Sequence, residues 1–166
     1  MDNLWPEINE QEIVIETPLH ILRIQAEYIG KITKNIIVGE VNKSPGIPKM
    51  PAETISEAIL ESFSETELSK NGFNSQDDFI YRFDLVAPSL GNYRFNLFII
   101  RYSIKIYPMI IYLDSDIAET DFALRPDEIK LKIQNEEKFI DALKIIFASS
   151  KTQTIVKTLL SHVSFE

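Results

Sequence analysis

The residues whose types and spacing could support catalysis are Asp114, Glu128 and Lys130. Asp114 ends an apolar run that we predict to be a strand. Glu128 and Lys130 are two residues apart on the next predicted strand, so their side chains share one face. Two carboxylates on neighbouring strands can hold Mg²⁺, and a nearby lysine can orient water or stabilise charge. The pattern therefore permits a Mg²⁺-dependent hydrolase or nuclease, with Glu27 or Glu40 as a further ligand.

This arrangement is that of the PD-(D/E)xK nuclease site, but three observations weigh against it. Lys132 lies on the same face as Glu128 and Lys130. Charged residues at alternate positions are what any half-exposed strand could show, so the pattern is not specific to a nuclease. The net charge of −8 opposes the approach of DNA, and a short motif taken alone is poorly specific. The acidic run from Asp114 to Asp121 also lacks the glycine and final glutamate of a Ca²⁺ loop. We therefore interpret residues 110–133 as two strands joined by a solvated loop.

Other catalytic motifs are absent from the sequence. It contains no cysteine, no G-x-S-x-G, and neither a Walker A nor a G-x-G-x-x-G pattern. Its two histidines fall near the start and the end of predicted helices, where a solvated or helix-end role is the better interpretation (His20 and His162). We accordingly assign no catalytic, cofactor-binding or metal-binding residue.

The composition is that of one globular domain. The chain has 166 residues, of which 45% are hydrophobic and 10% aromatic, enough for a substantial core. Its acidity disfavours nucleic acid as a partner, and its longest apolar runs are far shorter than the roughly 20 residues of a membrane span. We find no basic and apolar leader at the start. These features predict a cytoplasmic protein that binds neither nucleic acid nor membrane.

Helices are predicted at both ends of the chain. Thr17 is a good N-cap and Pro18 suits the first helical position of a helix that runs to about Lys34. Asn135 caps a second, and a third follows the break at residues 149–151. Residues 52–63 form a further predicted helix with an acidic stripe that could face a basic partner, although a solvated face is the commoner case (Glu53, Glu57, Glu61 and Glu65).

The strands cluster in the middle of the chain. Residues 78–113 alternate and are rich in β-branched and aromatic types, which predicts a three-stranded antiparallel meander with a turn near residues 102–103. Shorter strands are predicted at residues 35–41 and 127–133. We therefore expect a single α+β domain over residues 1–166. It comprises a mostly antiparallel sheet of four or five strands packed against N-terminal and C-terminal helices, an extended acidic arm at residues 1–16, and a proline-rich loop at residues 42–51.

Three functional hypotheses remain. The first is a non-enzymatic protein–protein interaction module, because catalytic motifs are lacking and the aromatic sheet offers more apolar surface than a few helices easily cover. Its partner would be another protein or a second copy of the chain. The alternative is the Mg²⁺-dependent hydrolase or nuclease at Asp114, Glu128 and Lys130. The third is a small-molecule sensor with a pocket between sheet and helices, for which fold alone is no evidence.

Overall fold

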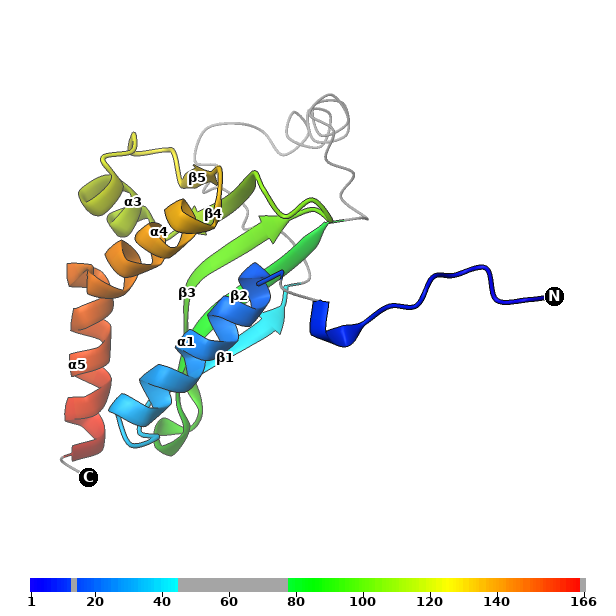
Figure 1. Ribbon diagram of the computed structural model, residues 1–166. Coiled ribbons are helices and arrows are strands. Elements are labelled where there is room, and N and C mark those ends of the chain that lie inside the picture. The colour runs from blue at the N-terminus through cyan, green and yellow to red at the C-terminus, as the bar shows by residue number, and fades with distance from the viewer. Residues whose placement is uncertain (13–14, 45–77, 165–166) are drawn as a thin grey trace, which may run out of the picture.

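The computed structural model describes residues 1–12, 15–44 and 78–164. Within them, an antiparallel five-stranded sheet has the order β1-β2-β3-β4-β5, and helices α1 and α4 cross the same side of it (Figure 1). The strands are β1 (Val38–Lys43), β2 (Phe79–Ala87), β3 (Tyr93–Tyr102), β4 (Met109–Leu113) and β5 (Lys130–Ile133). The helices are α1 (Pro18–Ile32), α3 (Ser115–Phe122), α4 (Glu136–Ala148) and α5 (Ser150–Ser164), with 3-10 turns at Glu10–Glu12 and Pro88–Leu90. The α+β prediction is confirmed.

Helix α1 begins where the sequence predicts. The Thr17 side chain accepts a hydrogen bond from the His20 amide, and Pro18 opens the helix. The helix ends at Ile32, earlier than predicted. Lys34 and Asn35 then have positive φ angles of 52° and 61°, so the chain turns sharply, and β1 starts at Val38 instead of residue 35. Left-handed residues of this kind end a helix because they break its hydrogen-bond ladder.

The meander over β2, β3 and β4 is confirmed, and β3 is its central strand. The pairing contains one irregularity that the sequence did not predict. Phe83 pairs with Phe98 but Asp84 pairs with Asn96, which leaves Leu97 as an extra residue in β3. Leu97 and Phe98 are consecutive, yet both belong to the hydrophobic core. The bulge therefore lets β3 direct two successive apolar side chains to the helix-covered side.

The segment after β4 differs from the prediction of a solvated loop. Asp114 is the N-cap of α3, and its carboxylate accepts a hydrogen bond from the Asp116 amide at 2.9 Å. Ile117 and Ala118 are buried, so this short helix packs into the body. The prediction failed because the acidic residues were taken as loop formers, whereas an aspartate cap followed by two buried apolar residues starts a helix. The strand predicted over 127–133 is accordingly shortened to Lys130–Ile133.

The C-terminal helices match the prediction. Asn135 accepts a hydrogen bond from the Lys138 amide and caps α4, whose first turn holds Glu136 and Glu137. The predicted break is at Ser149, whose hydroxyl accepts a bond from the Thr152 amide and so begins α5. These two helices meet at an angle beside the sheet (Figure 1).

Two predictions fall outside the described residues: the helix over 52–63 with its acidic stripe, and most of the proline-rich loop over 42–51. The N-terminal arm, defined here as residues 1–12, is described. Figure 1 draws it away from the body, and apart from a 3-10 turn it has no regular structure. The side chains of Leu4, Trp5 and Ile8 are 84%, 79% and 74% exposed.

Candidate functional site

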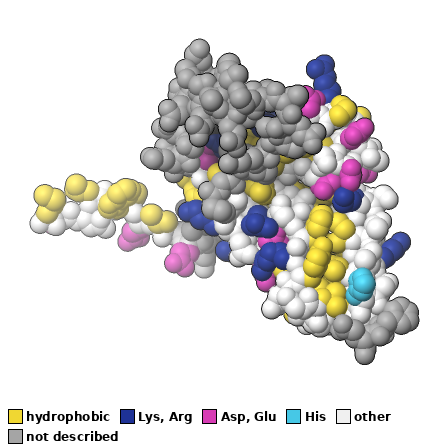
Figure 2. All heavy atoms as spheres, turned by 180° about the vertical axis from the view of Figure 1, so that it is seen from behind, with side chains coloured by type: hydrophobic (Ala, Val, Ile, Leu, Met, Phe, Trp, Pro, Cys, Tyr) yellow, Lys and Arg dark blue, Asp and Glu magenta, His cyan; other side chains and the backbone are white. Residues whose placement is uncertain are grey.

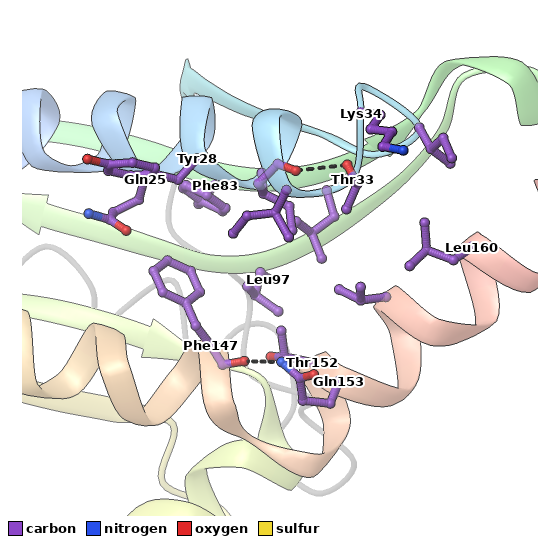
Figure 3. Close-up of a pocket in the computed structure, with 15 residues that line it drawn as sticks. Gln25, Tyr28, Thr33, Lys34, Phe83, Leu97, Phe147, Thr152, Gln153 and Leu160 are labelled. Carbon is purple, nitrogen blue, oxygen red and sulfur yellow. Dashed lines mark hydrogen bonds between the residues drawn. The ribbon is translucent and has the colours of Figure 1, made fainter.

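An apolar groove of about 500 Å³ lies between α1 and α5, over the sheet (Figure 3). Its floor is made by β2 and β3 through Phe83, Leu85 and Leu97. The α1 side contributes Gln25, Tyr28, Ile29, Ile32, Thr33, Lys34 and Ile36, and the α4–α5 side contributes Phe147, Thr152, Gln153, Val156 and Leu160. The volume lies within the range of about 300–1,000 Å³ typical of sites that bind a ligand.

Close packing at one point sets the position of the α1 wall. A Cβ atom added to Gly39 in β1 would lie 2.6 Å from the Cα of Ala26 in α1. Only glycine permits this approach, so α1 lies directly on the first strand. On the opposite wall, the Phe147 ring packs at 5.6 Å from the Phe83 ring and 6.2 Å from the Phe98 ring, measured between centroids. The two walls are thus tied to the sheet independently, and the groove is the space left between them.

The two threonine hydroxyl groups that line the groove are hydrogen-bonded to the backbone. The single hydroxyl proton of Thr33 is shared between the carbonyl oxygens of Ile29 and Ile37, and the hydroxyl oxygen accepts from the Ile37 amide. The Thr152 hydroxyl donates to the carbonyl oxygen of Ile146 at 2.7 Å, and the side-chain amide of Gln153 donates to the carbonyl oxygen of Phe147 at 2.9 Å. The groove therefore offers mainly apolar surface, with the Lys34 ammonium among its lining groups. This arrangement suits binding by shape and hydrophobic contact.

The helices that wall the groove are basic, although the chain has a net charge of −8. Helix α5 contains Lys151 and Lys157 and no acidic residue. Helix α1 contains Arg23 and Lys31 against the single acid Glu27. Lys34, just beyond α1, adds a further positive charge to the lining. An apolar segment flanked by acidic residues would therefore find both hydrophobic contact and attraction here.

Asp114, Glu128 and Lys130, the residues of the predicted metal site, occupy the ends of β4 and β5. The Leu113 amide donates to the Ile129 carbonyl at 2.8 Å, so Asp114 and Glu128 lie at adjoining strand ends. The Asp114 carboxylate, however, caps α3 and lies 3.9 Å from the Lys151 ammonium. Among residues 1–12, 15–44 and 78–164, no group of three or more His, Cys, Asp or Glu could hold a metal ion.

Lys151 links this region to α5. Its ammonium donates to the Asp116 carboxylate at 2.7 Å, and this hydrogen bond, together with attraction to Asp114 and Asp116, raises the pKa of Lys151. The contacts assign Asp114 and Asp116 to helix capping and to an ion pair between α3 and α5. His20 and His162 are exposed residues of the first turn of α1 and the last turn of α5.

A second charged cluster lies on the sheet face opposite the helices. Asp84, with a side chain 1% exposed, accepts hydrogen bonds from Arg82 at 2.8 Å, Arg94 at 3.0 Å and Asn96 at 2.9 Å. Arg94 also contacts Glu40 at 2.6 Å. The hydrogen bonds to Asp84 and Glu40 raise the pKa of Arg94. Two carboxylates and two guanidinium groups balance in charge, and the cluster joins β1, β2 and β3.

The sequence predicted parts of both sites but neither one completely. Strand alternation places Arg82 and Asp84 on one face, yet nothing local shows that Arg94 and Asn96 join them. In α5, the helical spacing of Ile155, Leu159 and Val163 in the sequence predicts that these three residues form its apolar face. Leu159 is indeed buried, but the groove is lined by Val156 and Leu160. The signal that could have revealed it is that apolar residues on α5 cover more than one stripe.

Comparison with known proteins finds no protein-family model, no curated protein and no solved structure that matches this chain. In the described part of the chain, no helix has both the length and the apolar character needed to cross a membrane. The groove is therefore the feature of the molecule that points to a function.

Proposed function

We propose that this protein is a non-enzymatic interaction module that binds an apolar, acidic segment of a protein in the groove between α1 and α5. The observation that carries the proposal is an unfilled apolar groove of about 500 Å³ between two basic helices. Its two lining threonine hydroxyls are hydrogen-bonded to backbone groups, which favours binding over catalysis. We include a cytoplasmic location in the proposal, because a chain without cysteine is compatible with a reducing compartment.

Two residues at the rim of the groove can be substituted to test this proposal without disturbing the core. Tyr28 and Ile32 line the groove but are 51% and 76% exposed, so substituting them leaves the core intact. Replacing both with glutamate removes apolar surface and adds charge that repels an acidic ligand. Ile104, 81% exposed in the loop between β3 and β4, is not part of the lining and provides the matched control.

The experiment is selection from a random peptide library on the immobilised full-length protein. We expect enrichment of peptides that combine large apolar residues with Asp or Glu. An enriched peptide should bind Tyr28→Glu/Ile32→Glu at least about tenfold more weakly, and Ile104→Glu as tightly as the wild type. Failure to enrich any such pattern, or equal binding to the groove variant, would overturn the proposal.

A second candidate function is binding of an apolar small molecule, which the size and the apolar lining of the groove favour. A neutral fluorescent dye such as N-phenyl-1-naphthylamine tests it. Binding of one dye molecule per chain that an enriched peptide cannot displace would support a small-molecule ligand. Displacement by the peptide would assign the groove to protein segments.

A further inference from the structure

We infer that the groove binds the N-terminal arm of a second copy of this chain, so that two copies exchange arms. This inference deepens the proposed function and depends on it, because it names the occupant of the same groove. Two parts of one chain are involved: an exposed apolar arm and an unfilled apolar groove. Apolar surface exposed to water is unfavourable on both parts, and binding of the arm in the groove would bury both surfaces.

The arm has the chemistry of the expected ligand. Leu4, Trp5 and Ile8 are exposed apolar residues within five positions of one another. Asp2, Glu7, Glu10 and Glu12 make the arm strongly acidic, and it has no lysine or arginine. Figure 2 shows hydrophobic and acidic side chains along the arm and none in the colour of Lys and Arg.

The groove has the complementary charge. Lys34 lines the groove. Lys157, which follows the lining residue Val156 in α5, is not itself part of the lining. In the part of the chain that the structure describes, neither ammonium forms an ion pair, whereas Lys31 and Lys151 are paired with Glu27 and Asp116. Two cations thus remain available beside the groove for the acidic arm, and attraction of this kind speeds encounter and sets the orientation of binding.

The route of the chain favours a second copy over the arm of the same chain. Thr17, which precedes α1, is extended with φ −82° and ψ 151°. The helix therefore does not continue into the arm, and Figure 1 draws the arm on the side far from α5. The groove lies along the C-terminal half of α1, so the arm of the same chain would have to reverse direction to reach it. An arm that points outward meets a neighbouring molecule directly.

The arm contains its own reporter, because Trp5 is the only tryptophan of the chain. In an isolated copy Trp5 is exposed and should emit at long wavelength. With arm exchange, the emission of the full-length protein should shift to shorter wavelength as concentration rises through the micromolar range. Sedimentation velocity should show, over the same range, a species of twice the chain mass of 19.1 kDa.

Two full-length variants separate exchange from folding back. The arm variant Leu4→Asp/Trp5→Ala/Ile8→Asp keeps the groove but loses its ligand. The groove variant Tyr28→Glu/Ile32→Glu keeps Trp5 but loses its site. Each should remain monomeric alone. Mixing them pairs one functional arm with one functional groove, and the emission of Trp5 should shift only in the mixture.

A pair of single substitutions tests the charge argument. Ile32→Lys and Ile32→Glu remove the same apolar side chain and introduce opposite charges. The dimer dissociation constant should rise at least about tenfold more for Ile32→Glu than for Ile32→Lys. Ile104→Glu should leave it unchanged.

The outcomes that overturn the inference are distinct from those that overturn the proposed function. A chain that stays monomeric with long-wavelength Trp5 emission at high micromolar concentration overturns arm exchange. If selected peptides still bind the groove in that case, the interaction module stands with another partner. A shifted emission that is independent of concentration, in a monomer, shows that the arm folds back and also overturns exchange.

Discussion

The two faces of the sheet differ in polarity: one carries a hydrogen-bonded cluster of charged side chains, and the other carries an apolar groove. On the face opposite α1 and α4, the buried carboxylate of Asp84 receives hydrogen bonds from Arg82, Arg94 and Asn96. On the helix-covered face, the groove between α1 and α5 presents apolar side chains with no such internal partner. The residues with the most conspicuous charges are therefore satisfied within the fold. The comparison teaches that clustered charge in this protein marks contacts within the fold, whereas the apolar groove has no comparable contacts of its own and is the better basis for a binding hypothesis.

The largest effect on stability is expected from removing the two arginines that pair with Asp84. Arg82→Met/Arg94→Met leaves the Asp84 carboxylate buried without its cations. The free energy of unfolding should fall by about 3–5 kcal/mol, because an uncompensated buried charge is costly. Urea denaturation measures this value. Lys31→Met, which removes a solvent-exposed pair with Glu27, is the control and should change it by less than about 0.5 kcal/mol.

Adding Asp84→Asn to the arginine double variant sharpens the same test. Without a charge to bury, the protein should recover part of the lost stability. A loss below about 1 kcal/mol in the double variant would mean that Asp84 reaches water easily and that the cluster is not a structural unit.

The next largest effect is expected at the wall of the groove. Gly39→Ala places a methyl group 2.6 Å from the Ala26 Cα, so α1 must shift away from β1. We expect a loss of about 2 kcal/mol in the free energy of unfolding, in the range found for overpacked cores. Binding of a groove-selected peptide should also weaken.

The control for Gly39 is a glycine in a different role. Gly91 has a φ of +66° with no atom close to an added Cβ, so Gly91→Asn should cost less than about 1 kcal/mol. An equal loss for both variants would indicate that the close approach of α1 and β1 is not what limits the Gly39 position.

A smaller effect is expected at the predicted metal site. Asp114→Ala removes the N-cap of α3 and should lower the free energy of unfolding by about 1 kcal/mol. Millimolar Mg²⁺ should not change the melting temperature of either protein. Asp127→Ala, at an exposed position, is the control and should be neutral within about 0.5 kcal/mol. A Mg²⁺-dependent rise in melting temperature that Asp114→Ala abolishes would restore the catalytic hypothesis.

The smallest effect concerns one polar atom that packs against the apolar core without a partner. The Tyr107 hydroxyl is buried and has no hydrogen-bond partner among the described residues. Tyr107→Phe should therefore keep or raise the free energy of unfolding, by less than about 1 kcal/mol. A clear destabilisation in chemical denaturation would show that this hydroxyl makes a useful contact.

The same residue predicts a pH dependence. Burial raises the pKa of Tyr107 from 10.0 to about 12, so the folded state favours the neutral phenol. This stabilisation is complete below pH 10 and is lost as pH rises from 10 to about 12. Burial gives Tyr102 the same shift, to about 12. Tyr107→Phe should reduce the alkaline loss of stability, measured by melting between pH 9 and 12, but should not abolish it.

Local sequence signals predicted much of the fold. Thr17, Pro18 and Asn135 define helix starts through short-range hydrogen bonding, and the alternation over residues 78–113 defines the meander. The prediction failed where long-range packing decides the outcome. Ile117 and Ala118 make α3 a helix because they find a buried site, and that site does not exist in the local sequence. The groove could not be predicted for the same reason: it depends on how far α1 and α5 stand apart.

The extra residue at Leu97 has a consequence for how the chain tolerates change. It puts the two halves of β3 out of step, so that Asn96 and Arg94 keep to one side while Phe98 and Ile100 keep to the other. Deleting that one position would restore a regular alternation and turn one half of the strand over. An insertion or deletion in one of the turns of the meander changes only the length of that turn, but here a single residue decides whether charged or apolar side chains face the helices.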